Sequence, residues 1–127
     1  MSINVPISTG ELLDKISILI IKEKNIQDEN KLLLVKNELT LLKATIEKLE
    51  NKSDINNYIE KLVDINTKLW NIEDQIRDCE RKKIFDQNFI DLARSVYITN
   101  DKRSKIKLEI NKKFDSEIVE VKSYEQY

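Results

Sequence analysis

The arginines of this chain are confined to one stretch of the sequence. They are Arg77, Arg81, Arg94 and Arg103, and every other basic side chain is a lysine. Arginine differs from lysine in its planar, permanently charged fork, which binds carboxylate or phosphate through two parallel hydrogen bonds. We therefore hypothesise that guanidinium groups from two helices meet at a polar, anion-binding site.

Acidic and aromatic side chains surround the first two arginines at helical spacing. Because residues three or four apart share a helix face, Glu73 or Asp74 can hold Arg77 within its own helix. Trp70 would supply an apolar wall, and polar residues near position 100 would face the same space from a following helix. The predicted ligand-binding set is Trp70, Glu73, Asp74, Arg77, Glu80, Arg81, Arg94, Asn100, Asp101, Arg103 and Lys107.

This set has two interpretations. As a pocket, arginine forks beside an indole suit an anionic small molecule such as a phosphate, a carboxylate or a sugar-phosphate. As a structural network, the same charges would form salt bridges that fix the register of two helices. In both cases the polar residues within the apolar stripe of residues 89–114 need partners, because burying an unpaired charge is costly.

Most classes of enzyme are excluded by the composition. The chain has no histidine, which removes the commonest acid–base residue and His-based metal sites. Its one glycine, Gly10, rules out the glycine-rich phosphate loops. The alternative is a magnesium-dependent all-helical phosphohydrolase using Glu73, Asp74 and Glu80, although residues 73 and 80 lack the offset of a Glu-x-x-Glu pair. We expect no catalytic residue, metal or cofactor, and the sequence favours a non-enzymatic binding or assembly module.

The fold class follows from the scarcity of turn-forming residues. With one glycine, one proline, 40% hydrophobic and 35% charged residues, the chain is typical of an all-α helical bundle. We predict a single domain with helices at about residues 8–26, 30–50, 54–83 and 87–113, the first in the middle of the packing. We predict short extended segments at both ends, residues 3–7 and 116–127, as strands that can pair with each other.

An unbroken heptad pattern runs through the third predicted helix. Apolar residues alternate at spacings of three and four along Ile55, Tyr58, Leu62, Ile65, Leu69, Ile72, Ile76 and Cys79. This pattern predicts a coiled-coil-like antiparallel hairpin with the preceding helix, and Cys79 as a core residue. The seam is longer than a small domain needs, so we predict a homodimer through the hairpin. In the alternative, a monomer, the first helix covers the seam.

The partners of the protein are limited by its charge and by the absence of targeting segments. One cysteine allows no internal disulfide, and we find neither a signal sequence nor a membrane span, which predicts a cytoplasmic protein. A basic segment, residues 77–114, precedes an acidic tail, residues 115–127, so the basic segment can bind an anion or its own tail. An overall pI near 5.6 argues against nucleic-acid binding.

Three motifs extend over much of the chain: GELLDKI at residues 10–16, LWxIEDxIRxCER at 69–81 and LARxVYxxNDxR at 92–103. In these motifs the chain resembles an uncharacterised family of small bacterial and phage proteins. The resemblance covers nearly the whole length and is weakest at residues 43–57. It implies a common fold but no function, and it adds Glu11 and Lys15, one helical turn apart, as further members of the predicted site.

Overall fold

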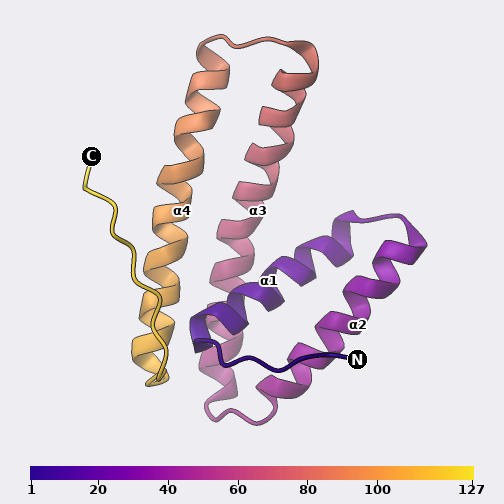
Figure 1. Cartoon of the computed structure of the whole chain (residues 1–127), viewed down its shortest axis with the longest axis vertical. Coiled ribbons are helices and arrows are strands. Elements are labelled where there is room, and N and C mark those ends of the chain that lie inside the picture. The colour runs from indigo at the N-terminus through magenta and orange to yellow at the C-terminus, as the bar shows by residue number, and fades with distance from the viewer.

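A computed structural model describes all residues, 1–127, and contains helices but no strands. The four helices are α1 (Thr9–Asn25), α2 (Glu29–Ile46), α3 (Lys52–Lys82) and α4 (Gln87–Lys113) (Figure 1). The prediction of an all-α helical bundle is therefore confirmed. No helix combines the length and the apolar composition needed to cross a lipid bilayer.

Three of the helices begin at side-chain caps. The Ser8 hydroxyl, the Asp28 carboxylate and the Asp86 carboxylate each accept a hydrogen bond from a first-turn amide, at 2.9–3.1 Å. The start of α3 differs from the prediction, which placed it at about residue 54. Asn51 precedes α3 in the left-handed conformation, with φ of 60°, and makes no side-chain cap. The helix therefore begins earlier than predicted, at Lys52.

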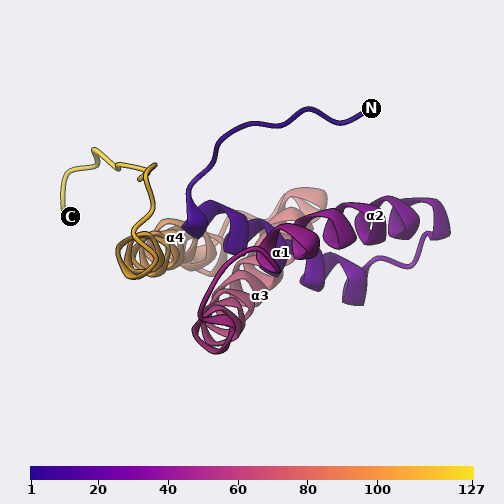
Figure 2. The ribbon, with the colours of Figure 1, turned by 90° about the horizontal axis from the view of Figure 1, so that it is seen from below.

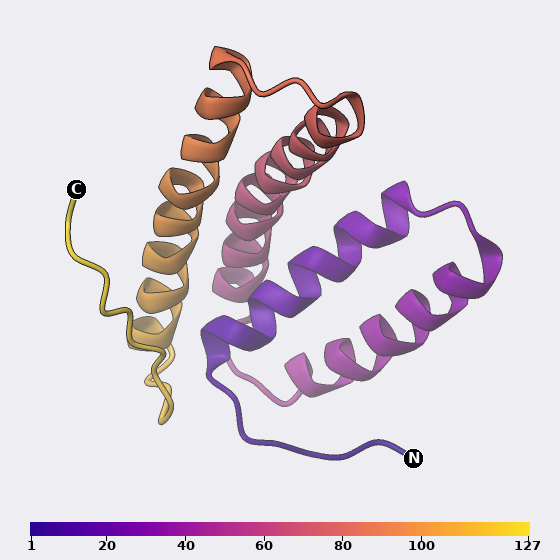
Figure 3. The same cartoon turned by 45° about the horizontal axis from the view of Figure 1, so that its top comes forward.

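The helices form two antiparallel hairpins, α1 with α2 and α3 with α4 (Figure 3). Helix α1 crosses the α3–α4 hairpin near its base and contacts each of the other helices, whereas α2 packs against α1 alone. The prediction that the first helix lies in the middle of the packing is confirmed. The long hairpin, however, consists of α3 and α4 rather than α2 and α3, because the seam of α3 packs against α1 and α4.

The hydrophobic core lies where α1 crosses α3. Leu13, Ile16, Ile55, Leu62 and Ile110 are fully enclosed there. Beyond this crossing the α3–α4 hairpin continues as two helices with no other helix packed over them (Figure 1). The molecule therefore consists of a long hairpin with a shorter hairpin attached across its lower half.

The two ends of the chain do not pair. Residues 1–7 leave α1 toward α2, whereas residues 116–127, the C-terminal tail, turn back along α4 (Figures 1 and 2). Asp115 makes this reversal possible by adopting a left-handed φ of 53° directly after the helix. The predicted extended ends are present, but the strand pairing between them is not.

Candidate functional site

A group of polar side chains is enclosed where α1, α3 and α4 meet. We call this group the polar cluster. It consists of Glu11, Asp14, Ser17, Asn66, Asn100, Arg103 and Lys107.

Asp14 lies at the centre of the polar cluster and is only 1% exposed. Its Oδ1 atom accepts hydrogen bonds from Arg103 Nε at 3.0 Å and from Asn66 Nδ2 at 2.8 Å. Its Oδ2 atom pairs with a terminal nitrogen of Arg103, which makes the contact bidentate. Ser17 accepts a second hydrogen bond from Asn66 at 2.8 Å, and donates to the Asp14 backbone carbonyl at 2.7 Å. One carboxylate thus joins three helices.

Lys107 extends the polar cluster toward the C-terminal tail. Its side chain is 12% exposed, and its ammonium group lies 2.7 Å from Glu11, 3.5 Å from Asp14 and 3.4 Å from Glu120. Glu120 belongs to the tail, so the basic segment does meet its own acidic tail, as one interpretation of the sequence predicted. Arg103 also donates to Asn100 at 3.3 Å. No buried side-chain nitrogen or oxygen lacks a hydrogen-bond partner.

The backbone of α1 comes unusually close to α4 beside the polar cluster. The amide of Gly10 donates to Asn111 Oδ1 at 2.7 Å, and the amide of Thr9 donates to Ser116 Oγ at 3.2 Å. A Cβ atom on residue 10 would lie 2.6 Å from the carbonyl oxygen of Lys107. Glycine is therefore required at this position because it is the one residue that permits the approach.

The pKa values of the buried charges shift in the directions that keep them ionised. Burial by itself would raise the pKa of Asp14, but hydrogen bonds from Arg103 and Asn66, with the charges of Arg103 and Lys107, outweigh it and hold that pKa below its usual value. The hydrogen bond to Asp14 raises the pKa of Arg103. Burial would lower the pKa of Lys107, yet the Glu11 hydrogen bond and the nearby carboxylates raise it.

The lowered pKa of Asp14 predicts a loss of stability in acid. A carboxyl group whose pKa is lower in the folded than in the unfolded state stabilises the fold at pH values above its unfolded-state pKa. For aspartate the unfolded-state pKa is about 3.9. That contribution disappears as the pH falls through the folded-state pKa. We expect the free energy of unfolding, measured by urea titration from neutral pH into acid, to fall less steeply below about pH 4 for Asp14→Asn than for the wild type. Asp64→Asn, at an exposed aspartate of α3, should leave the wild-type slope unchanged.

Only part of the predicted set comes together in the structure. Of the arginines, Arg103 alone reaches another helix. Arg77 is 72% exposed and its ion-pair partner is Glu73, while Arg81 is 68% exposed and pairs with Asp78, all within α3. Arg94 is exposed and has no carboxylate within 4.0 Å. The expected convergence of the four guanidinium groups is not found.

The remaining predicted residues divide in the same way. Glu11, Asn100 and Lys107 belong to the polar cluster, whereas Lys15 lies at its edge, 4.0 Å from Glu11. Asp101 accepts a hydrogen bond from Tyr127 of the tail at 2.7 Å. The others lie on α3 away from the cluster: Trp70 is half-buried, and Glu73, Asp74 and Glu80 are exposed.

Sequence reasoning missed four residues of this neighbourhood: Asp14, Ser17 and Asn66 in the polar cluster, and Asn111 beside it. A signal for Asp14 was present, because it interrupts the most apolar stretch of the chain one turn after Glu11 and one turn before Ser17. Asn66 likewise lies one turn after Leu62, beside the heptad seam. An uncompensated polar residue at such a position implies a buried partner on another helix.

The carboxylates of the polar cluster are occupied by cations of the protein itself. Nowhere in the chain do three or more His, Cys, Asp or Glu side chains gather as they would around a metal ion. The geometry therefore suits a structural role, in which the polar cluster fixes where α1 crosses the α3–α4 hairpin.

Comparison with known proteins places the whole chain in one family. No curated protein and no solved structure matches it. A family of unknown function, DUF6165, matches residues 3–127. The chain therefore belongs to the DUF6165 family.

Proposed function

We propose that the protein is a non-enzymatic assembly module that forms a homodimer through the upper half of the α3–α4 hairpin, which comprises residues 70–97. The observation that carries the proposal is the change in burial along the α3 seam. Up to Leu69 the seam is covered by α1 and α4, but the following members, Ile72, Ile76 and Cys79, are all partly exposed. Beyond Leu69 the heptad pattern continues, but α4 covers it only in part.

Helix α4 and the connection between the two helices carry matching apolar groups. Phe85 is 53% exposed and its ring stacks edge-on against Phe89, and both Ile84 and Ile90 are about half exposed. A hairpin of two helices has no third element to bury these groups. A second copy of the same hairpin would complete a four-helix bundle around one seam, which is the usual way in which such apolar stripes are covered.

The charges of this region favour a second copy over a strongly charged partner. Residues 70–97 contain six acidic and five basic side chains, so two identical faces would not repel each other. Several of these charges are already paired within α3, including Glu73 with Arg77 and Asp78 with Lys82. Flanking pairs of this kind resemble the charged borders of a coiled-coil seam. A self-complementary face is what a twofold dimer requires.

Sedimentation equilibrium tests the pairing directly. We expect the wild type to form a dimer at concentrations on the order of 100 µM or below, and Ile76→Asp to weaken association by about 100-fold, because the interface would bury an unpaired charge. Phe85→Asp should act in the same direction, and because Phe85 is already half exposed it leaves the fold of the monomer intact. Leu34→Asp, on the exposed face of α2, should associate like the wild type.

A monomeric wild type throughout this concentration range would refute the pairing. Equal weakening by Leu34→Asp would also refute it, since the effect would then come from added charge rather than from the seam. Circular dichroism of each variant separates loss of association from loss of fold.

The two small-molecule functions suggested by the sequence have less support. An anionic ligand between α3 and α4 would have to compete with Asp14 for Arg103, while Arg77, Arg81 and Arg94 lie elsewhere on the surface. The magnesium-dependent phosphohydrolase needs clustered carboxylates, which the chain does not contain.

A further inference from the structure

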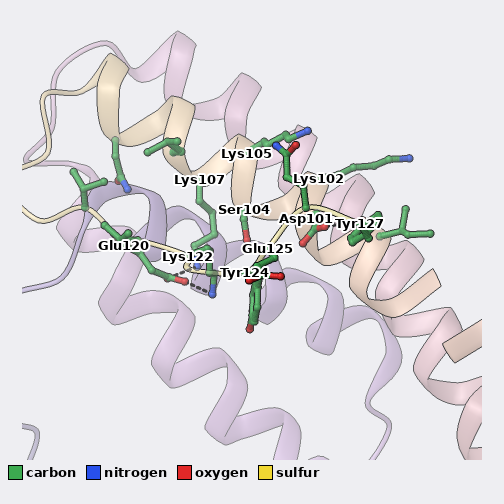
Figure 4. Close-up of a pocket in the computed structure, with 16 residues that line it drawn as sticks. Asp101, Lys102, Ser104, Lys105, Lys107, Glu120, Lys122, Tyr124, Glu125 and Tyr127 are labelled. Atoms are coloured by element: carbon green, nitrogen blue, oxygen red, sulfur yellow. Dashed lines mark hydrogen bonds and ion pairs between the residues drawn. The ribbon is translucent and has the colours of Figure 1, made fainter. Parts of the chain in front are cut away.

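A groove of about 750 Å³ lies between α4 and the C-terminal tail (Figure 4). Its volume falls within the range of about 300–1,000 Å³ typical of small-molecule sites. One wall is the face of α4 between Ile98 and Asn111, and the other is formed by tail residues 119–127. The groove is therefore separate from the upper half of the hairpin, where we propose that two copies pair.

The tail wall is attached to α4 mainly at its two ends. At the near end Glu120 contacts Lys107, and at the far end the Tyr127 hydroxyl donates to Asp101 while its ring packs edge-on against Tyr97 at 5.4 Å. No backbone group of residues 117–127 donates a hydrogen bond to another backbone group. A segment held in this way can lift from the helix without disrupting any secondary structure.

At the inner end of the groove the Glu120 carboxylate lies beside the Lys107 ammonium group. The Lys107 ammonium is mostly enclosed, and its three carboxylate contacts come from two different segments of the chain. Glu11 and Asp14 are fixed on α1, whereas Glu120 belongs to the tail and is 41% exposed. An external anion can therefore displace the Glu120 carboxylate from Lys107. The carboxylates of Glu11 and Asp14 would stay in place.

The rest of the groove carries charges of both signs, from lysines and from Asp101 and Glu125, together with apolar surface. Lys102 and Lys105 line its outer part, and neither has a carboxylate within 4.0 Å. Their ammonium groups point away from Lys107 (Figure 4), so they raise the positive potential of the outer part of the groove from a distance. Ile98 and Leu108 provide apolar surface on α4, and Tyr124 provides an aromatic ring on the tail. Aromatic side chains contribute contact area to flat ligands at little cost in conformational entropy.

We propose that this groove binds a phosphorylated ring compound of the nucleoside monophosphate type, whose phosphate replaces Glu120 beside Lys107. The ring lies between the apolar face of α4 and the tail. Lys122, which pairs with Glu120 in the structure, also contacts the phosphate, and Lys102 and Lys105 attract it at longer range. The tail is then both a wall of the site and an internal competitor for it. This proposal is independent of the pairing of two copies.

Calorimetric titration of the full-length protein with adenosine monophosphate tests the proposal. Glu120→Gln should tighten binding several-fold, because the competing carboxylate loses its charge. Glu117→Gln, which also removes one negative charge from the tail but lies outside the groove, should leave the affinity unchanged. A purely structural role for Glu120 predicts no gain in affinity.

A charge-reversed pair provides the opposite test. Lys102→Glu combined with Lys105→Glu should weaken binding by at least about tenfold, which corresponds to about 1.4 kcal/mol. The matched control is Lys36→Glu with Lys43→Glu, two exposed lysines of α2 whose substitution changes the net charge equally. Adenosine and inorganic phosphate should each bind more weakly than adenosine monophosphate.

Several results would overturn the proposal: no binding of adenosine monophosphate, equal weakening by the α2 control, or equal affinity for inorganic phosphate alone. Ile76→Asp, the variant designed to prevent pairing, should bind adenosine monophosphate like the wild type. Failure of the groove and failure of the dimer are therefore distinguishable.

Discussion

Replacing Asp14 with alanine is expected to lower the free energy of unfolding by about 3–5 kcal/mol, the typical loss when one member of a buried ion pair is removed. The substitution would leave Arg103 without its bidentate partner and remove an acceptor from Asn66. Because domains of this kind are stable by only about 5–15 kcal/mol, this is a large fraction of the total. Urea unfolding followed by circular dichroism measures it.

Two further substitutions make the result interpretable. Asp14→Asn keeps the shape of the side chain but removes its charge, so it should destabilise the fold less than Asp14→Ala and remain measurable if the alanine variant does not fold. Asp64→Ala, at an exposed site of α3, should change stability by no more than about 0.5 kcal/mol. Equal effects of Asp14→Ala and Asp64→Ala would show that the polar cluster contributes nothing to stability.

Gly10→Ala is expected to destabilise the protein by about 2 kcal/mol or more, although alanine is the better helix former. The added Cβ would lie 2.6 Å from the Lys107 carbonyl oxygen and 2.9 Å from Asn111 Oδ1. The first of these atoms is backbone and cannot rotate away. Helix α1 must therefore move off α4, which weakens the hydrogen bond between Gly10 and Asn111 and loosens the ion pair between Asp14 and Arg103. The same unfolding measurement detects the loss.

The matched control for Gly10→Ala is Asn30→Ala. Asn30 is the second residue of α2, as Gly10 is of α1, but it is exposed and no helix approaches it. Its replacement should leave stability unchanged or raise it slightly, since alanine has the higher helix propensity. If both substitutions raised stability, the conclusion that α1 lies too close to α4 for a side chain at residue 10 would be wrong.

Local sequence signals predicted the fold class well because each depends on neighbouring residues. The cap at Ser8, the heptads of α3 and the scarcity of glycine all act within a few turns of helix. The pairing of helices is different, because heptad seams are interchangeable and α3 packs equally well against either neighbour in the chain. In the structure α4 takes this place, and it is joined to α1 at Gly10 by a contact between residues about a hundred positions apart, which no local pattern reports.

The candidate site shows the same division. Residue type identified Arg103 and Lys107 correctly as members of a polar group, since they interrupt an apolar stripe. Clustering in the sequence misled the interpretation of Arg77 and Arg81, because these residues lie on the part of α3 that extends beyond α1. The decisive partner, Asp14, comes from the first helix. Counting polar residues within apolar stripes would have found it, whereas counting arginines could not.

Helix α2 is joined to the rest of the protein through α1 alone. None of the hydrogen bonds of the polar cluster involves α2, so detachment of this helix leaves the junction of the other three intact. We therefore expect α2 to open at a lower free energy than the junction of the other three helices. Val35, Leu39 and Ile46 of α2 belong to the same core as the buried residues of α1 and α3, so loss of this helix would expose apolar surface but break no polar contact of the junction.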